Sequence, residues 1–358
     1  MDPHQPIQEP LVSTSPHFAE VRWSALPTQL RPTRDASVDA LVGAIDGNPW
    51  LKQQVQQQGA VLLRGFPIDT IDDFSRVAEA FTTGLQTTYP GVVPRKKIRG
   101  FVHNSTELSR HYPIPQHCEM SFSAEPPRHL LFGCMVAPPK GGETPLADFR
   151  SVWAALPTAV RQRFERGGLR IVRNYDGPAT RGLGDPMKYT TWDSIFKTTD
   201  RDEVALKVEA LGWELRWCAN DRLRLISTQE VTRVHPPSGL AAWHTHLTSF
   251  HIATGEAEFR HLWQRDHKLK HGVLALALAA LTRLRRRFTT PDEFPTHCTY
   301  RDGSEIPSAD IQALREVIWH NTTAFRWQRG DLLLIDNLAV SHGRNPYRGP
   351  RQIVVAWA

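Results

Sequence analysis

Residues 116–122 read QHCEMSF and place a histidine, His117, two positions before a carboxylate, Glu119. On a β-strand, residues i and i+2 project to the same face, whereas on an α-helix they diverge by about 200° around the axis. The run into the segment, residues 112–115 (YPIP), favours a strand. The segment therefore predicts a strand over residues 116–121 that presents an imidazole and a carboxylate to one ion. Such pairs are common by chance, so this pair gains weight only from other residues.

The carboxyl-terminal segment supplies candidate partners for this pair. A turn signal at Gly330-Asp331 precedes an apolar run, residues 332–335, that reads as a buried strand; His342 lies just beyond that strand, and Arg351 begins the next one. Two histidines and one carboxylate on one face of a metal leave the opposite positions free, which suits ferrous iron that must bind O2 and another ligand. Because an unpaired buried guanidinium is costly, we expect Arg351 to meet a dicarboxylic acid that chelates the metal at its other end.

The remaining pattern predicts an α+β fold with a β-sandwich core and helices packed outside it. Residues 1–36 are rich in Pro, Ser, Thr and Gln and are expected to form an extended or poorly ordered arm. Residues 37–358 are expected to form a single domain with a helical insertion around residues 150–320. Further helices are predicted over 37–58, 72–83, 151–166, 200–211, 272–287 and 308–320, and further strands over 59–66, 100–102, 130–135, 223–225, 232–234, 241–246, 323–327 and 352–357.

Composition describes an ordinary globular protein. The chain has 358 residues, 40% of them hydrophobic, and its longest apolar stretch, residues 272–281, is about half of what a membrane span needs. No apolar run follows a basic amino-terminal segment, and the four cysteines are scattered, so we expect a cytoplasmic protein with reduced thiols and no membrane partner.

The net charge is +6, with a basic cluster at residues 283–287. This cluster reads as the solvated end of a helix or a docking site for an acidic macromolecule; nucleic acid is disfavoured because no aromatic residues interleave the arginines.

Six segments in this order resemble one known family. They are 59–66 (GAVLLRGF), 116–122, 141–150 (GGETPLADFR), 191–196 (TWDSIF), 235–239 (HPPSG) and the carboxyl-terminal segment from 329 onward. Together they resemble the taurine dioxygenase and clavaminate synthase-like family of Fe(II)/2-oxoglutarate-dependent oxygenases. Within that family, the chain looks most like the hydroxylases of amino-acid building blocks in nonribosomal peptide and related antibiotic pathways.

The resemblance implies a double-stranded β-helix, or jelly roll, in which His117, Glu119 and His342 bind Fe(II). It also implies that Arg351 holds the distal carboxylate of 2-oxoglutarate and that the Thr144 hydroxyl assists it. The implied reaction uses O2 to hydroxylate a C–H bond of an amino-acid-derived small molecule, which is either free or tethered to an acidic peptidyl carrier protein.

Several points of this assignment leave alternatives. The interval from His342 to Arg351 is shorter than in the taurine dioxygenase relatives, so Arg344 and Arg348 are possible substitutes, and Arg351 itself could pair with Asp336. Cys118 stands where close relatives often carry Asn, and we expect its side chain to point away from the metal. Thr144 alone could cap a turn.

Two further residues, Asn104 and His246, are candidate substrate contacts. Asn104 also fits simple turn chemistry. His246 forms a competing metal pair with His244, but the first acid after them, Glu256, is poorly spaced for a shared site. Relatives often carry Phe-Asn at 244–245, so substrate specificity cannot be inherited from them.

The activity also has alternatives. A retained Glu119 argues for oxygen transfer, because halogenating relatives replace that carboxylate with a small residue. Desaturation, epoxidation or sulfonate oxidation would use the same site. A non-catalytic binding protein on this scaffold, or a metal-dependent isomerase or hydrolase on a cupin-like barrel, would belong to different classes.

Overall fold

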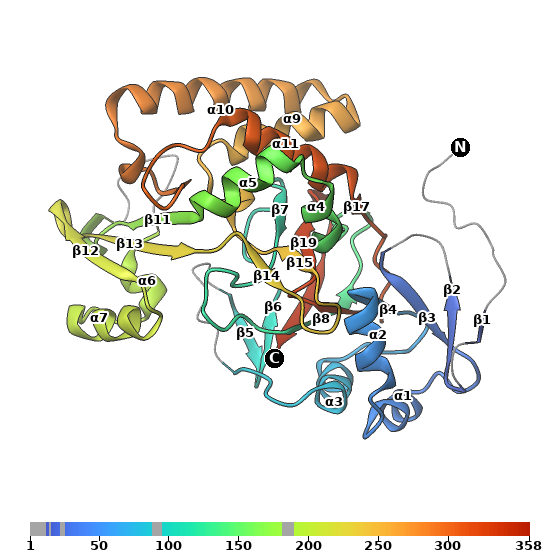
Figure 1. Ribbon diagram of the computed structural model, residues 1–358. Helices are drawn as coiled ribbons and strands as arrows, with labels where there is room; N and C mark the ends of the chain where they lie inside the picture. The colour runs from blue at the N-terminus through green and yellow to red at the C-terminus, as the bar shows by residue number, and fades with distance from the viewer. Residues whose placement is uncertain (1–11, 14–15, 22–25, 88–94, 181–189) are drawn as a thin grey trace.

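The computed structural model describes residues 12–13, 16–21, 26–87, 95–180 and 190–358 (Figure 1). Its centre is a sandwich of two β-sheets. The large sheet has nine strands in the order β1-β2-β3-β4-β18-β8-β21-β6-β5, and the small sheet has four in the order β17-β10-β19-β7. All neighbouring strands are antiparallel except β3 and β4.

The strands of the large sheet are β1 (Val12–Ser13), β2 (Phe18–Val21), β3 (Thr28–Pro32), β4 (Ala60–Leu63), β5 (Lys97–Arg99), β6 (Val102–Asn104), β8 (His129–Val136), β18 (Leu332–Asp336) and β21 (Gln352–Trp357). Those of the small sheet are β7 (Ile114–His117), β10 (Leu146–Asp148), β17 (Thr322–Thr323) and β19 (Val340–Arg344).

Strand β18 is apolar from Leu332 to Ile335 because both of its faces are buried there. Leu333 and Ile335 point into the core between the two sheets, where they join Leu146 of β10. Leu332 and Leu334 point the other way, into a second core under the amino-terminal helices. These helices are α1 (Val38–Ile45), α2 (Trp50–Gln58) and α3 (Ile71–Phe81). The predicted strand over 332–335 is thus present, and it lies in the middle of the molecule.

Part of the expected amino-terminal arm is built into the large sheet. Strands β1 to β3 extend one edge of that sheet, where β3 pairs with β4. Phe18 of β2 is buried and stacks on Trp50 of α2, with 5.3 Å between the ring centroids. This contact attaches the segment to the body of the protein.

The insertion between β10 and β17 contains a sheet as well as helices (Figure 1). Its helices are α4 (Phe149–Ala155), α5 (Thr158–Gly167), α6 (Trp192–Phe196), α7 (Arg201–Ala210), α8 (Leu247–Phe250), α9 (Thr254–Asp266), α10 (Leu269–Phe288) and α11 (Ser308–His320). A four-stranded antiparallel sheet has the order β12 (Glu214–Cys218), β13 (Arg222–Gln229), β11 (Leu169–Tyr175), β16 (Thr296–Thr299), and a hairpin joins β14 (Thr232–Val234) to β15 (Ala241–Trp243).

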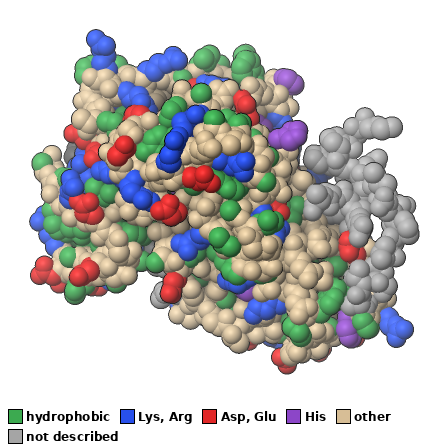
Figure 2. All heavy atoms as spheres, viewed as in Figure 1, with side chains coloured by type: hydrophobic (Ala, Val, Ile, Leu, Met, Phe, Trp, Pro, Cys, Tyr) green, Lys and Arg blue, Asp and Glu red, His purple; other side chains and the backbone are tan. Residues whose placement is uncertain are grey.

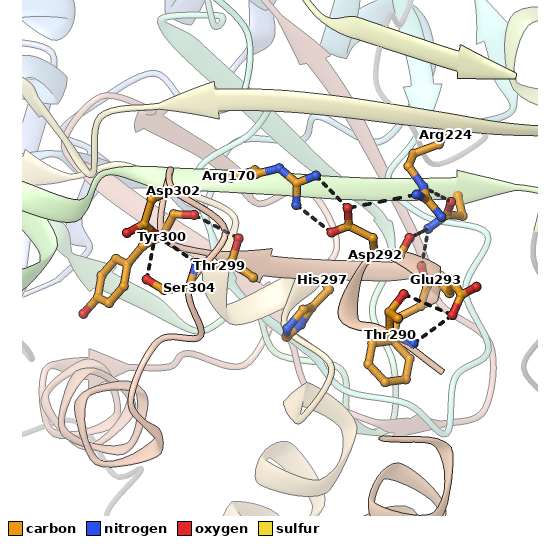
Figure 3. A network of polar contacts seen from close by, with 12 residues as sticks. Arg170, Arg224, Thr290, Asp292, Glu293, His297, Thr299, Tyr300, Asp302 and Ser304 are labelled. Atoms are coloured by element: carbon orange, nitrogen blue, oxygen red, sulfur yellow. Dashed lines mark hydrogen bonds and ion pairs between the residues drawn. The ribbon is translucent and has the colours of Figure 1, made fainter. Parts of the chain in front are cut away.

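The expectation of a helical insertion was therefore incomplete, because it missed β11, β12 and β16. The sequences of β11 and β12 interrupt the apolar pattern with arginines, and β16 is a short strand with the sequence THCT. Figure 3 shows how two arginines of this sheet are bonded. Arg170 of β11 donates two hydrogen bonds to Asp292, at 2.6 and 2.8 Å. Arg224 of β13 donates to Asn174 at 3.0 Å. These charged strand residues are thus held by hydrogen bonds in the folded insertion.

The longest helix, α10, lies against α9 at one end of the molecule (Figure 1). It has 20 residues, but its carboxyl-terminal turn is basic. None of the helices in the described part of the chain is both long and apolar enough to cross a membrane.

Candidate metal centre

Strands β7 and β19 bring two of the predicted metal ligands together. They are antiparallel neighbours in the small sheet, and His117 lies directly opposite His342. The two ring centroids are 4.4 Å apart. His342 is 5% exposed, whereas His117 is partly exposed. His342 lies beyond the strand 332–335, as expected, but it belongs to a further strand, β19, which lies in the small sheet and precedes the strand at Arg351.

Glu119 reaches the same place by a turn rather than by a strand. Strand β7 ends at His117, so the prediction of a strand through residue 121 was wrong. Met120 adopts a positive φ of 51°, which an extended strand cannot accommodate. The buried amide of Asn337 fixes the turn: its Oδ1 accepts from the Glu119 N–H at 2.7 Å, and its Nδ2 donates to the Glu119 carbonyl at 2.9 Å. The carboxylate is thereby turned toward His342, with 3.7 Å between Oε2 and Nε2.

The three side chains converge with metal-ligand spacing. One ligand atom from each of His117, Glu119 and His342 lies within 4.8 Å of the other two. His117 Nδ1 donates to the Pro115 carbonyl at 2.9 Å, so the neutral ring keeps its lone pair on Nε2. Burial lowers the pKa of both histidines below the ordinary value, which favours the neutral imidazole that a metal requires. These residues fit a two-histidine, one-carboxylate metal site.

Arg95 is a component of this centre that sequence reasoning missed. Its Nη2 donates to Glu119 Oε2 at 2.6 Å, and its side chain is 8% exposed. Arg95 precedes the short strand β5 by two positions in a basic stretch, and nothing in that pattern indicates that its side chain turns inward.

A second group of possible ligands, His251, His297 and Glu305, has similar spacing. His297 lies on β16 (Figure 3). Here the backbone N–H groups of Ala253 and Ile252 donate to the Nδ1 atoms of His251 and His297, at 3.2 and 3.5 Å. Each neutral ring therefore carries its proton on Nε2, and that of His297 bonds Glu305 at 3.0 Å. A metal bound at Nε2 would require each neutral ring to carry its proton on Nδ1, facing a backbone N–H donor, so these hydrogen bonds disfavour a metal at this group.

A cavity of about 210 Å³ opens onto the first centre. Arg351, at the start of β21, faces it: Nε donates to the Gly142 carbonyl at 3.1 Å, and Nη1 to Ser105 at 3.5 Å. Among the described residues no carboxylate pairs with it. Burial and the neighbouring Arg344 lower its pKa to about 10, so it stays protonated at neutral pH. The cavity is lined by Arg95, Ser105, Thr106, Leu108, Pro113, Ile114, Pro115, His117, Glu119, Phe122, Phe132, Thr144, His246, Ser249, Phe250, His342, Gly343, Arg344 and Arg351.

The two substitute arginines have other roles. The guanidinium of Arg344 donates hydrogen bonds to three backbone carbonyls, those of Leu108, Ser109 and Tyr112, at 2.6 to 2.9 Å. Arg348 is exposed and does not line the cavity. Arg351 is therefore the arginine available to a carboxylate.

Asp336 and Thr144 support this assignment. Asp336, the alternative partner of Arg351, is buried beside His235, with 3.2 Å between Oδ2 and Nε2. The Thr144 hydroxyl accepts from Trp327 Nε1 at 3.2 Å, which leaves its own hydrogen to donate to a ligand in the cavity.

The two candidate substrate contacts differ in position. His246 lines the cavity, its ring stacked on Phe250 and its Nδ1 2.6 Å from Ser121 Oγ. Asn104 does not line it; its amide donates to Glu107 at 2.8 Å, which is the turn chemistry considered for it. His244 is buried outside the cavity lining, and the competing pair with His246 forms no ligand cluster among the described residues.

Comparison with known proteins gives one family and several relatives. The profile of the "Taurine catabolism dioxygenase TauD, TfdA family" matches residues 26–357. The dapdiamide synthesis protein DdaC of Enterobacter agglomerans is 30% identical over 347 residues, which are 97% of this chain and 92% of that protein. A clavaminate synthase-like protein of Arabidopsis thaliana is 29% identical over 315 residues, 86% of this chain and 83% of that protein.

Among solved structures, PvcB, described as an Fe, α-ketoglutarate-dependent oxygenase from an isonitrile synthetic pathway, superposes with a TM-score of 0.54. The alignment covers 98% of this chain and 94% of PvcB at 15% identity, so it shows a shared fold alone.

Proposed function

Because this chain belongs to the TauD, TfdA family of Fe(II)/2-oxoglutarate-dependent dioxygenases, we propose that it hydroxylates a C–H bond of an amino-acid-derived small molecule. The observation that carries this proposal is the convergence of His117, Glu119 and His342 in one cavity with the guanidinium of Arg351, which pairs with no carboxylate in the described part of the chain. A metal cation and a dicarboxylate together satisfy both features.

Each residue has a defined part in this proposal. Nε2 of His117, Nε2 of His342 and the Glu119 carboxylate would hold the iron. Arg351 would bind the far carboxylate of 2-oxoglutarate, and Thr144 would donate to it. When bound, iron, 2-oxoglutarate and O2 supply an oxidant for C–H bonds, with succinate and CO2 as co-products. The protein positions the reactants and excludes water from them.

The cavity walls restrict the substrate. Leu108, Ile114, Phe122 and Phe250 supply apolar surface, and His246 adds a polar group near His117, with 5.2 Å between the two ring centroids. A small molecule with an apolar portion next to a hydrogen-bonding group fits these walls. The likeness to a dapdiamide synthesis protein supports an amino-acid-derived molecule.

A carrier-tethered substrate has support from the surface of α10. Figure 2 shows apolar and basic side chains together over this helix, at the upper edge of the view. Leu269 and Leu276 are 77% and 73% exposed, and Arg283 and Arg287 are exposed at the other end. An acidic carrier protein would complement these charges.

The test measures succinate formation and O2 uptake with a panel of amino acids, each presented free and loaded on a carrier protein. We expect succinate to form with one substrate and the product to gain one oxygen atom by mass spectrometry. His342→Ala, which removes one metal ligand, should abolish both signals. Metal-dependent turnover without O2 uptake would favour an isomerase or hydrolase instead.

A further inference from the structure

Arg95 lies beside the candidate metal centre, in a fixed position. Its Nη1 donates to the Ser105 carbonyl at 2.5 Å, and its guanidinium carbon lies 5.9 Å from the centroid of the Trp357 ring. The second arm of the guanidinium, Nη2, donates to Glu119 Oε2 at 2.6 Å. One side of the group is thus tied to the backbone, and the other side is tied to the carboxylate.

Glu119 has a rigid backbone but a flexible side chain. Asn337 fixes the backbone of the turn through two hydrogen bonds to Glu119. Three rotatable bonds still separate the backbone from the carboxylate, which must point at the space between the two histidines. A charge-assisted hydrogen bond to one carboxylate oxygen removes much of that freedom.

We propose that Arg95 is a positioning residue that orients the Glu119 carboxylate for metal binding, an inference that rests on the proposed function. A carboxylate has about four acceptor positions on its two oxygens, so it can accept from Arg95 and still bind a cation. Because Ser105 and Trp357 hold the guanidinium to one side, Arg95 stays in place when a cation binds. Groups that orient metal ligands in this way typically contribute a factor of about 10–100 to metal affinity.

Arg351 provides a matched comparison in the same cavity. It is also a partly buried arginine that contacts Ser105, but through the Oγ atom, and it lies against Gly142 instead of Glu119. Removing its charge changes the electrostatics of the cavity in a similar way without touching a metal ligand. The two arginines should therefore affect different ligands.

The experiment titrates metal-free full-length protein anaerobically with Fe(II), and separately with Co(II) as a visible probe, without 2-oxoglutarate. We expect Arg95→Met to weaken metal binding by about 10- to 100-fold and to alter the Co(II) visible spectrum. Arg351→Met should not weaken the binding of either metal, since it touches no metal ligand and removes a positive charge from the cavity. Arg95→Lys should recover part of the affinity, because an ammonium can still donate to Glu119.

An affinity of Arg95→Met equal to or higher than that of the unsubstituted protein, with an unchanged Co(II) spectrum, would overturn the proposal. Circular dichroism identifies a variant that fails to fold, and in that case Arg95→Lys decides: a weaker affinity and an altered spectrum support the positioning role, and unchanged values contradict it. If the unsubstituted protein itself binds no Fe(II), the proposed function fails, which is a different outcome.

Discussion

Individual side chains of the candidate site owe their chemistry to their hydrogen-bond partners. The Pro115 carbonyl selects the tautomer of His117, and the Trp327 indole leaves the Thr144 hydroxyl with a hydrogen to donate. In the cluster at His251 and His297, backbone N–H donors select the opposite tautomer. Two groups with similar spacing therefore differ in their ability to bind a metal.

The first prediction concerns Arg351. Replacing it with Met should raise the dissociation constant for 2-oxoglutarate by roughly 10- to 150-fold, because a hydrogen bond to a charged group is worth about 1.5–3 kcal/mol. Isothermal titration with the Fe(II)-loaded protein under anaerobic conditions measures this. Arg348→Met, at an exposed position outside the cavity, serves as the control and should leave the constant unchanged. A raised dissociation constant in Arg348→Met, with an unchanged one in Arg351→Met, would show that Arg348 binds the 2-oxoglutarate carboxylate instead.

The sequence allows the prediction of some of these residues but not of others. His117, His342 and Arg351 stand out because their types and order match a known chemistry. Arg95 and Asn337 do not, because their roles arise from long-range contacts: Asn337 bonds a residue 218 positions away. Asn104 was a candidate substrate contact with turn chemistry as the alternative, and its amide donates to Glu107 in a local turn.

At the scale of elements, the carboxyl-terminal strands could be predicted because they are apolar and bounded by turn signals. The predicted strand over 116–121 was too long. The prediction used the alternation of strand side chains to place His117 and Glu119 on one face, whereas in the structure a turn held by Asn337 brings Glu119 beside His117. Strands β11 and β12 were missed because arginines interrupt their apolar pattern; Arg170, for example, meets Asp292 only in the folded chain. Strand β18, whose first four residues are apolar, was therefore easier to predict than β11, which is buried but contains two arginines.

The second prediction concerns the turn that carries Glu119. Asn337→Ala leaves three buried backbone groups without their partner, those of Glu119 N–H, Glu119 C=O and Pro127 C=O. We expect a loss of about 2–4 kcal/mol in the free energy of unfolding, measured by urea denaturation, together with weaker Fe(II) binding. Asn104→Ala, which removes the hydrogen bonds of a surface turn, should change either quantity little. Equal effects of the two substitutions would show that Asn337 has no special role.

The third prediction concerns the packing of α3 on the large sheet. A Cβ added at Gly133 of β8 would lie 2.6 Å from Phe74 Cδ2, so Gly133→Ala should lower the unfolding free energy by about 1–3 kcal/mol. Gly43 of α1 has no neighbour within 4 Å of an added Cβ and has no positive φ. Gly43→Ala should therefore raise the unfolding free energy by about 0.5–1 kcal/mol. Thermal melts of both variants test the pair, and a stable Gly133→Ala protein would refute the close packing.

At the scale of the whole molecule, helices pack on both sides of the sandwich, and the metal ligands come from the small sheet and from the turn that follows β7. The large sheet carries the amino-terminal helices on one face, and the small sheet adjoins the insertion. The ligands come from segments more than two hundred positions apart, so the complete fold is required to assemble the site. The general two-sheet arrangement could be predicted from the sequence, but the content of the insertion could not.

The fourth prediction is a loss of stability in acid. Burial lowers the pKa of His129 to about 4 and the pKa values of His244 and His251 to about 3, from an ordinary 6.5. Below pH 6.5 these histidines become protonated in the unfolded chain. In the folded protein they stay neutral until the pH reaches their lower pKa values. Stability is therefore full above pH 6.5 and falls between about pH 6.5 and 4, by at most about 1.4 kcal/mol per pH unit for each histidine.

Urea denaturation at pH 7.5, 6 and 5 measures this trend. The midpoint should fall steadily as the pH decreases. His251→Gln, which removes one of the three groups, should reduce the slope even if it lowers stability at neutral pH. A midpoint that stays constant across this range would mean that these histidines are protonated in the folded protein.

The most direct test of the central assignment is anaerobic absorption spectroscopy of the protein with Fe(II) and 2-oxoglutarate. We expect a visible metal-to-ligand charge-transfer band that requires both components, that is lost in His342→Ala, and that needs a higher 2-oxoglutarate concentration in Arg351→Met. The absence of the band in the unsubstituted protein, or its full retention in His342→Ala, would contradict the assignment of this cavity as an iron and 2-oxoglutarate site.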